Sequence, residues 1–223
     1  MDIALPSGTP AHLVETAGAD RGLVIVPDIW GLRPLFTEMC HEVAARTGWS
    51  VASFDPFGGG DLPPAEDPEG FPARSAALER LDDTVLMADA VAAADATGAP
   101  AVGLIGFCMG GMYALKASGA GRFDRIVSFY GMITVPEDWA GEGQGQPLDA
   151  LAGRGDCEVM AVVGTEDPWT PAEQVDRLRS LGVEVVSYEG ADHGFVHDPA
   201  RPTHRPDDAA DAWEKGLAFL DGL

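Results

Sequence analysis

Cys108 is the residue whose neighbours most clearly suggest chemistry. It lies in the segment GLIGFCMGGMY (103–113), with one glycine two positions before it and another two positions after it. In esterases a serine at the centre of such a segment occupies a tight turn between a strand and a helix. The sequence therefore predicts either a cysteine nucleophile on that turn or a small buried thiol, which is the commoner fate of a lone cysteine.

The segments around Cys108 fit the first alternative. An apolar run of strand length (101–107) leads directly into the cysteine, and a helical pattern (109–119) follows at once. The N-terminus of that helix would favour the thiolate over the thiol, and the N–H group of Met109 would point to where an oxyanion forms. So tight a turn needs small residues around it, and the chain has Gly106, Gly110 and Gly111.

A base and an orienting acid occur later in the chain, each directly after a predicted strand. Asp167 follows the strand at 158–165, and His193 follows the strand at 183–190. A single aspartate before a proline is often only a turn residue, and a single histidine is more often on the surface. The order nucleophile, acid, histidine is nevertheless that of the α/β-hydrolases. The sequence therefore predicts a triad of Cys108, His193 and Asp167.

The elements that must hold these residues alternate between strands and helices. The strands are continuous apolar runs, as in sheets covered on both faces, at 22–29, 51–57, 101–107, 125–131, 158–165 and 183–190, and an edge strand is expected at 12–17. Helical patterns occur at 33–48, 72–97, 109–119, 171–182 and 207–221. This alternation predicts one α/β domain over residues 1–223, with a mainly parallel sheet and helices on both faces.

Two stretches rich in glycine, proline and acidic residues, 57–72 and 136–156, are predicted to be loops. Long loops in a compact domain are usually functional or disordered. Whether these two border a pocket stays open at this point.

Composition excludes several classes of partner. The chain has 223 residues, 14 basic residues and a formal charge of −22, so nucleic acid and anionic membranes are poor candidate partners. The N-terminus has no basic segment followed by an apolar one, and no apolar run approaches the roughly 20 residues of a membrane span. We expect a cytoplasmic protein.

The cysteines and glycine-rich segments suggest no metal and no cofactor. Cys40, Cys108 and Cys157 have the spacing of neither a disulfide framework nor a zinc site. The segment GFCMGG lacks the lysine of a phosphate-binding loop, and FGGGD does not open a helix as a dinucleotide-binding motif must.

Taken together, these motifs resemble the dienelactone hydrolase family from about residue 20 to the C-terminus. The segments that carry the resemblance are VIVPDIWGL (24–32), FDPFGGGD (54–61), GLIGFCMGG (103–111), FYG (129–131), GTEDPWTP (164–171) and GADHGF (190–195). The resemblance implies a compact α/β-hydrolase fold and cleavage of a lactone or ester through a thioester acyl-enzyme. It implies that Cys108 is the nucleophile, His193 the base and Asp167 the orienting acid, with the N–H groups of Met109 and Ile29 as the oxyanion hole.

The resemblance also assigns Asp28, which stands where the family usually has a glutamate that takes up the thiol proton. The alternative is that Asp28 only caps the turn toward the helix at 33. Trp30 and Trp169 adjoin proposed site residues and are expected to wall an acyl pocket, unless they belong to the core.

In the dienelactone enzymes proper, an arginine four positions after the histidine binds the substrate carboxylate. Here that position is His197, which we expect to reach the substrate pocket. Four other arginines are candidates for binding a substrate carboxylate, although each could equally be an ordinary solvated surface residue: Arg74, Arg80, Arg201 and Arg205.

The expected function is therefore hydrolysis of a small-molecule ester or lactone by a monomer or small homo-oligomer. A glutamine-amidotransferase-like or peptidase-like protein also carries cysteine at such a turn, but its histidine often lies beside the cysteine, where this chain has Met109. The remaining alternative is a non-catalytic hydrolase-fold protein that binds ligand or senses oxidants through the thiol, although no second cysteine lies near Cys108 to resolve an oxidised form.

Overall fold

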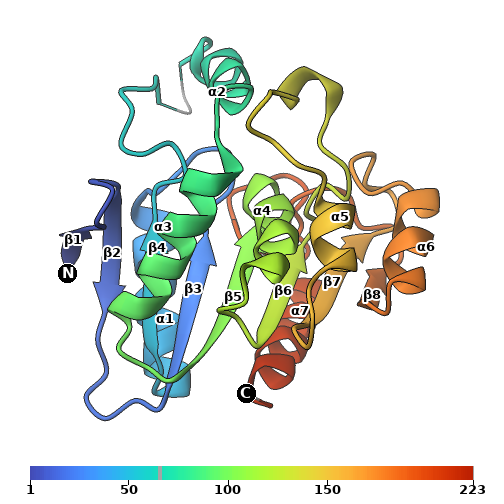
Figure 1. Cartoon of the computed structure of the whole chain (residues 1–223). Helices are drawn as coiled ribbons and strands as arrows, with labels where there is room; N and C mark the ends of the chain where they lie inside the picture. Colours follow the sequence, from blue (N-terminus) through green and yellow to red (C-terminus); the bar gives the residue numbers. More distant parts are fainter. Residues whose placement is uncertain (65–66, 223) are drawn as a thin grey trace.

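The computed structural model describes residues 1–64 and 67–222, which contain an eight-stranded sheet in the order β1-β2-β4-β3-β5-β6-β7-β8 (Figure 1). The pairs β1–β2 and β2–β4 are antiparallel and all the other pairs are parallel. The strand bounds are β1 (Asp2–Ala4), β2 (Pro10–Val14), β3 (Arg21–Val26), β4 (Ser50–Phe54), β5 (Ala101–Phe107), β6 (Arg125–Phe129), β7 (Glu158–Gly164) and β8 (Glu184–Tyr188).

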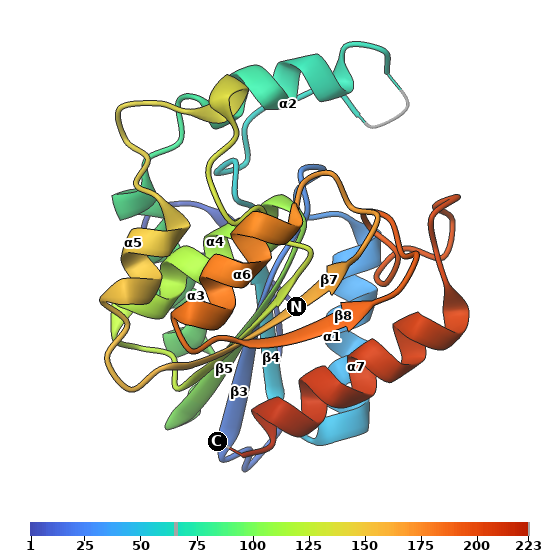
Figure 2. The same ribbon diagram turned by 90° about the vertical axis from the view of Figure 1, so that its right-hand side faces the viewer.

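Helices cover both faces of the sheet. Figures 1 and 2 show α1 and α7 on one face and α3, α4 and α6 on the other. The helix bounds are α1 (Pro34–Thr47), α2 (Gly70–Leu78), α3 (Asp83–Ala96), α4 (Met109–Ala117), α5 (Pro147–Ala152), α6 (Ala172–Ser180) and α7 (Pro206–Leu220), with 3-10 helices η1 (Ser118–Ala120) and η2 (Glu137–Trp139). The predicted α/β fold, mainly parallel with helices on both faces, is confirmed.

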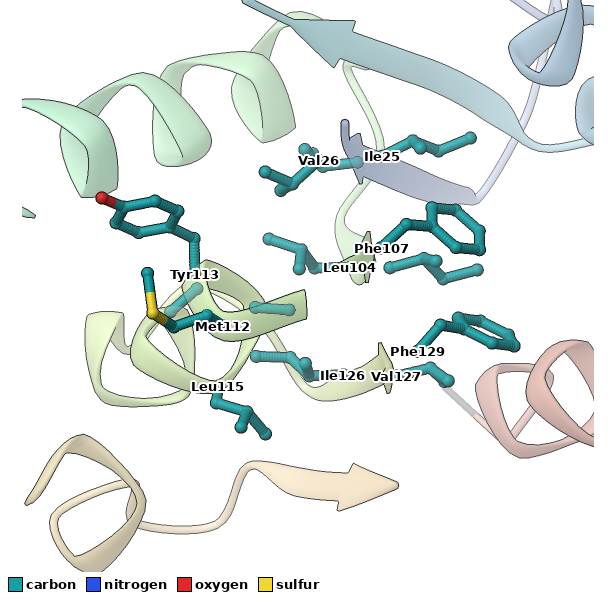
Figure 3. Close-up of a cluster of buried hydrophobic side chains, with 14 of the residues drawn as sticks. Ile25, Val26, Leu104, Phe107, Met112, Tyr113, Leu115, Ile126, Val127 and Phe129 are labelled. Atoms are coloured by element: carbon teal, nitrogen blue, oxygen red, sulfur yellow. The ribbon is translucent and has the colours of Figure 1, made fainter. Parts of the chain in front are cut away.

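The central strands alternate their side chains between the two layers (Figure 3). Val26, Leu104 and Ile126 point toward the side of α4, whereas Phe107 and Phe129 point to the opposite side. All five side chains are almost completely buried. Burial of these apolar groups on both faces fixes the register of β3, β5 and β6, and with it the heights at which these strands end.

Some elements differ from the sequence predictions. The edge strand expected at 12–17 is β2, which lies inside the sheet because β1 pairs with it along the outer side. The helix expected at 72–97 is two helices, because Asp82 is extended and its carboxylate accepts a hydrogen bond from the N–H of Thr84 at 2.7 Å, capping α3. Residues 65 and 66 of the loop expected at 57–72 lie outside the described residues.

The second expected loop, 136–156, contains η2 and α5 and packs against α2. The N–H of Asp83 donates to the carbonyl of Gly143 at 2.9 Å, and a Cβ on Gly141 would lie 1.8 Å from the carbonyl oxygen of Glu79. Together α2 and η2 form a cap over the carboxyl edge of the sheet (Figure 2). These two elements are called the cap.

The parallel strands β3, β5, β6, β7 and β8 all end at the edge beneath this cap. Val26 at the end of β3 is level with Gly106 of β5, and Gly164 of β7 is level with Tyr188 of β8. Residues that follow these strands are therefore brought together, as is usual for ligand sites on parallel sheets. None of the helices in residues 1–64 and 67–222 combines the length and the apolar character that crossing a membrane requires.

Candidate active site

Cys108 occupies a strained turn between β5 and α4. Its backbone has φ 55° and ψ −120°, a conformation that residues other than glycine rarely adopt. The glycines around it are needed for space: a Cβ on Gly106 would lie 2.0 Å from the carbonyl oxygen of Gly110, and a Cβ on Gly110 would lie 2.2 Å from that of Val26. The turn thus places Cys108, which is only 6% exposed, at the N-terminus of α4.

His193 and Asp167 meet at the same edge. The imidazole Nδ1 of His193 lies 2.9 Å from Oδ2 of Asp167, and the Asp167 side chain is fully buried. The other oxygen of Asp167 accepts a hydrogen bond from the N–H of Trp169 at 2.8 Å, which fixes the carboxylate. Because Asp167 occupies Nδ1, the ring presents Nε2 as its remaining polar atom.

The electrostatics of His193 depend on Cys108. Burial would lower the pKa of His193, but the charge of the Cys108 thiolate and the hydrogen bond with Asp167 raise it to about 10. The buried Nε2 has no hydrogen-bond partner in the part of the chain that the structure describes. This arrangement suits a protonated imidazole whose Nε2 is left for a reacting group.

Burial keeps the other two thiols of the chain neutral. Burial raises the pKa of Cys40 to about 12 and that of Cys157 to about 11. Both therefore stay protonated near neutral pH, which makes them poor nucleophiles.

Two backbone N–H groups, those of Met109 and Ile29, are the candidates for the predicted oxyanion hole. Met109 is the first residue of α4, so its N–H has no partner within the helix. Ile29 follows β3 and lines the same cavity as Cys108. Neither N–H is hydrogen-bonded to another residue in the ranges 1–64 and 67–222.

Asp28 is completely buried, and both of its carboxylate oxygens already have partners. Oδ1 accepts from the N–H of Trp30 at 3.0 Å and from Arg33 at 2.6 Å. Oδ2 lies 3.1 Å from Nη2 of Arg33 and 2.8 Å from Nε2 of His197. Burial would raise the pKa of Asp28, but the hydrogen bonds from His197 and Arg33 and the charge of the Arg33 guanidinium hold that pKa well below its ordinary value.

His197 lies behind the site rather than in it. Its side chain is fully buried, and its Nδ1 lies 2.5 Å from the hydroxyl of Tyr130. Burial lowers the pKa of His197, so the neutral ring donates through Nε2 to Asp28 and accepts through Nδ1 from the Tyr130 hydroxyl. Tyr130 in turn packs edge-on against His193, with 5.3 Å between the ring centroids.

A cavity of about 230 Å³ connects Cys108 and His193 under the cap. Its lining includes Cys108, His193, Ile29 and the two tryptophans expected in the pocket, Trp30 and Trp169. The expected pocket residue His197 is not part of this lining; it contributes instead to a larger groove of about 640 Å³ between α1 and α7. The reason is the hydrogen bond to Asp28, which draws the ring under the edge of the sheet.

Sequence reasoning missed three other lining residues: Phe71, Met132 and Trp139. Phe71 and Trp139 lie in the segments whose contact with a pocket stayed open, and no periodic pattern marks either. Arg201 was one of four arginines considered, and it is the one that lines the cavity. Arg74 instead donates to the carbonyl of Pro63 and lies over the ring of Trp30 at 5.3 Å.

Comparison with known proteins decides the family. The model of the dienelactone hydrolase family matches residues 10–223. The chain belongs to the dienelactone hydrolase family. The resemblance that the sequence motifs suggested is thereby confirmed.

Individual members of the family have low sequence identity to this chain. A probable 2-oxo-3-(5-oxofuran-2-ylidene)propanoate lactonase from Bradyrhizobium is 28% identical over 212 residues, covering 89% of this chain and 82% of that protein. A carboxymethylenebutenolidase from Rhodococcus opacus is 26% identical and covers 94% of this chain and 84% of its own length. The crystal structure of a putative dienelactone hydrolase from Klebsiella pneumoniae has a TM-score of 0.84 at 20% identity, covering 100% of this chain and 98% of that chain. It has the same fold.

Proposed function

We propose that this member of the dienelactone hydrolase family hydrolyses carboxylic esters or lactones through a thioester on Cys108. The observation that carries the proposal is the His193–Asp167 pair, whose Nδ1 and Oδ2 atoms lie 2.9 Å apart, with His193 and Cys108 lining one cavity. Relatives named as a lactonase and as carboxymethylenebutenolidases support lactones as substrates.

The reaction begins with the thiolate of Cys108 beside the imidazolium of His193. The sulfur attacks the carbonyl carbon, the carbonyl π electrons move to oxygen, and the N–H groups of Met109 and Ile29 hydrogen-bond to that oxyanion. When the tetrahedral intermediate collapses, the carbon–oxygen ester bond breaks. The alkoxide leaves with the proton from Nε2 of His193, and the acyl group stays on sulfur.

Hydrolysis of the thioester uses the same groups in the reverse direction. His193, now neutral, takes a proton from water as the water oxygen attacks the thioester carbonyl. Collapse of the second intermediate releases the carboxylic acid and restores the thiolate and the imidazolium. Asp167 holds the imidazole orientation in both halves.

Asp28 has a positioning role in this scheme. Its oxygens are held by Arg33, His197 and the N–H of Trp30, and the last contact shapes the turn that presents Ile29. This geometry favours the turn-capping interpretation of Asp28, with His193 as the base that serves the thiol.

Turnover of p-nitrophenyl acetate by the wild type and by Cys108→Ala tests the proposal. We expect Cys108→Ala to lose turnover and Cys157→Ala, a matched change at a buried thiol, to keep it. Iodoacetamide labelling of Cys108 across pH is measured in parallel. Strong labelling without turnover by either protein would contradict the hydrolase and favour the thiol sensor.

A further inference from the structure

The cavity above Cys108 is walled by aromatic rings from two separate parts of the fold. Trp30 and Trp169 come from the carboxyl edge of the sheet, whereas Phe71 of α2 and Trp139 of η2 come from the cap. Trp139 and Trp169 stack with 5.8 Å between centroids and 19° between planes, and Trp30 and Phe71 lie 6.3 Å apart. The cap and the carboxyl edge of the sheet thus form an aromatic slot, which consists of these four side chains.

The mouth of the aromatic slot is unusually apolar for a surface. Phe71 is 47% exposed and Trp169 is 40% exposed. In the part of the chain that the structure describes, the other large hydrophobic side chains exposed to this degree are Met1 and Val85, neither of which lines the cavity. Exposed aromatic surface gathered around a cavity marks a place where an apolar ligand enters.

The cap holds its two aromatic residues in place before any ligand binds. The indole N–H of Trp139 donates to the hydroxyl of Ser75 on α2 at 3.1 Å. The side-chain amide of Gln144 donates to the carbonyl of Leu78 at the end of α2. Since η2 and α2 are tied together, the aromatic slot is preformed, and a flat group can enter it with little loss of side-chain freedom.

Charge around the cavity disfavours an anionic acyl group. Apart from His193, Arg201 is the charged residue among those lining the cavity. Its Nη2 lies 3.6 Å from Oδ2 of the buried Asp28. Because Asp28 offsets part of the charge of Arg201 and the chain as a whole has a net charge of −22, a carboxylate on the substrate meets little uncompensated positive charge here.

We infer that the aromatic slot selects uncharged esters or lactones whose acyl group is flat and apolar, such as an aromatic ring attached to the carbonyl. The inference rests on the proposed function, because it names the substrate class of the same site. Aromatic rings bind a planar face better than a puckered one.

The shape requirement is tested with p-nitrophenyl benzoate and p-nitrophenyl cyclohexanecarboxylate, which share a six-membered ring and the leaving group. Each kcat/KM is divided by the rate of alkaline hydrolysis of the same ester to remove intrinsic reactivity. We expect the benzoate to be favoured by at least about tenfold. Equal values, or a preference for the cyclohexane ester, would overturn the flat-group requirement.

The role of Trp169 is tested with Trp169→Ala, and Val85→Ala serves as a matched loss of an exposed apolar side chain on α3, away from the cavity. The ratio of kcat/KM for the benzoate to that for p-nitrophenyl acetate should fall about tenfold in Trp169→Ala. That ratio should stay at the wild-type value in Val85→Ala. An unaltered ratio in Trp169→Ala would contradict the aromatic slot.

The charge requirement is tested with the p-nitrophenyl esters of 4-isopropylbenzoic acid and 4-carboxybenzoic acid, whose para substituents are similar in shape. We expect kcat/KM for the carboxylate ester to be at least about tenfold lower at low salt, with the gap narrowing as salt is added. A carboxylate ester that is the better substrate, with the advantage lost in Arg201→Gln, would make the cavity an anion site and overturn the inference.

These outcomes separate the two proposals. Turnover of the acetate that depends on Cys108 but shows no benzoate preference would defeat the substrate inference alone. No turnover of any of these esters that depends on Cys108 would defeat both.

Discussion

Gly110 is a position at which one added methyl group should affect both stability and turnover. Its Cβ would lie 2.2 Å from the carbonyl oxygen of Val26 and 2.3 Å from that of Pro27, whereas ordinary contacts begin at 3.4 Å. Both obstacles are backbone atoms, so α4 or the end of β3 must move by about 1 Å. We expect Gly110→Ala to lower the free energy of unfolding by about 3 kcal/mol, the upper end for overpacking.

The same displacement should impair catalysis, because Pro27 leads directly to Ile29 and its proposed oxyanion N–H. A misplacement of about 1 Å costs on the order of 100-fold in rate, and we expect a fall of that size in kcat/KM for p-nitrophenyl acetate. Unfolding is followed in urea by circular dichroism, with Gly119→Ala as the control, since the nearest atom there is 3.6 Å from the added Cβ. A Gly110→Ala protein as stable and active as Gly119→Ala would refute the close approach of α4 to β3.

Three further outcomes are expected. Asp28→Asn should reduce the turnover of p-nitrophenyl acetate far less than His193→Ala does, because the amide oxygen still accepts from the N–H of Trp30; a loss as complete as in Cys108→Ala would mean that Asp28 itself transfers a proton. His193 has its pKa raised from 6.5 to about 10, so its contribution to stability is fully present below pH 6.5 and is lost as the pH rises toward 10. Cys108 gives up a proton when His193 gains one, so the two effects offset each other until the thiol of the unfolded chain also ionises, near about pH 8.5. The stability advantage of the wild type over His193→Gln in urea unfolding should therefore fall mainly between about pH 8.5 and 10, and an advantage that grows over this interval would contradict the imidazolium. Cys40→Ser should leave turnover unchanged, since burial raises the pKa of that thiol to about 12; a folded but inactive Cys40→Ser would show that the nucleophile is misassigned.

The central strands could be predicted from sequence because they are buried on both faces. A continuous apolar run such as 101–107 leaves few alternatives, and glycines on both sides of Cys108 point to the tight turn. Asp167 and His193 were identifiable because each directly follows such a run, and parallel strands end at one edge. Local pattern and global fold agree at these positions.

The cap could not be predicted in the same way, because long-range packing determines it. The break between α2 and α3 had a local signal, the aspartate at 82 two residues before Thr84, but the three residues before that aspartate are all good helix formers. The contact of Gly141 with the carbonyl of Glu79 joins residues far apart in the chain. Phe71 and Trp139 therefore line the cavity although no sequence pattern predicts this position.

His197 shows a different limit. Its spacing from His193 suggested a pocket residue. A buried carboxylate needs hydrogen-bond donors, however, and the Nε2–H of His197 donates to Asp28 at 2.8 Å. The Tyr130 hydroxyl holds the other nitrogen. Three residues from separate strand ends thus form a buried network whose membership no single segment reveals.

Trapping the acyl group tests whether Cys108 forms the thioester. His193→Ala is mixed with excess p-nitrophenyl acetate, quenched and digested, and the peptides are compared by mass spectrometry with those of the wild type. We predict an acetyl group on the peptide that contains Cys108, which persists in His193→Ala after the wild type has released it, and none on the peptides of Cys40 or Cys157. Steady turnover by the wild type with no acetyl group on Cys108 in either protein, or acetylation of another residue at the rate of turnover, would contradict the mechanism.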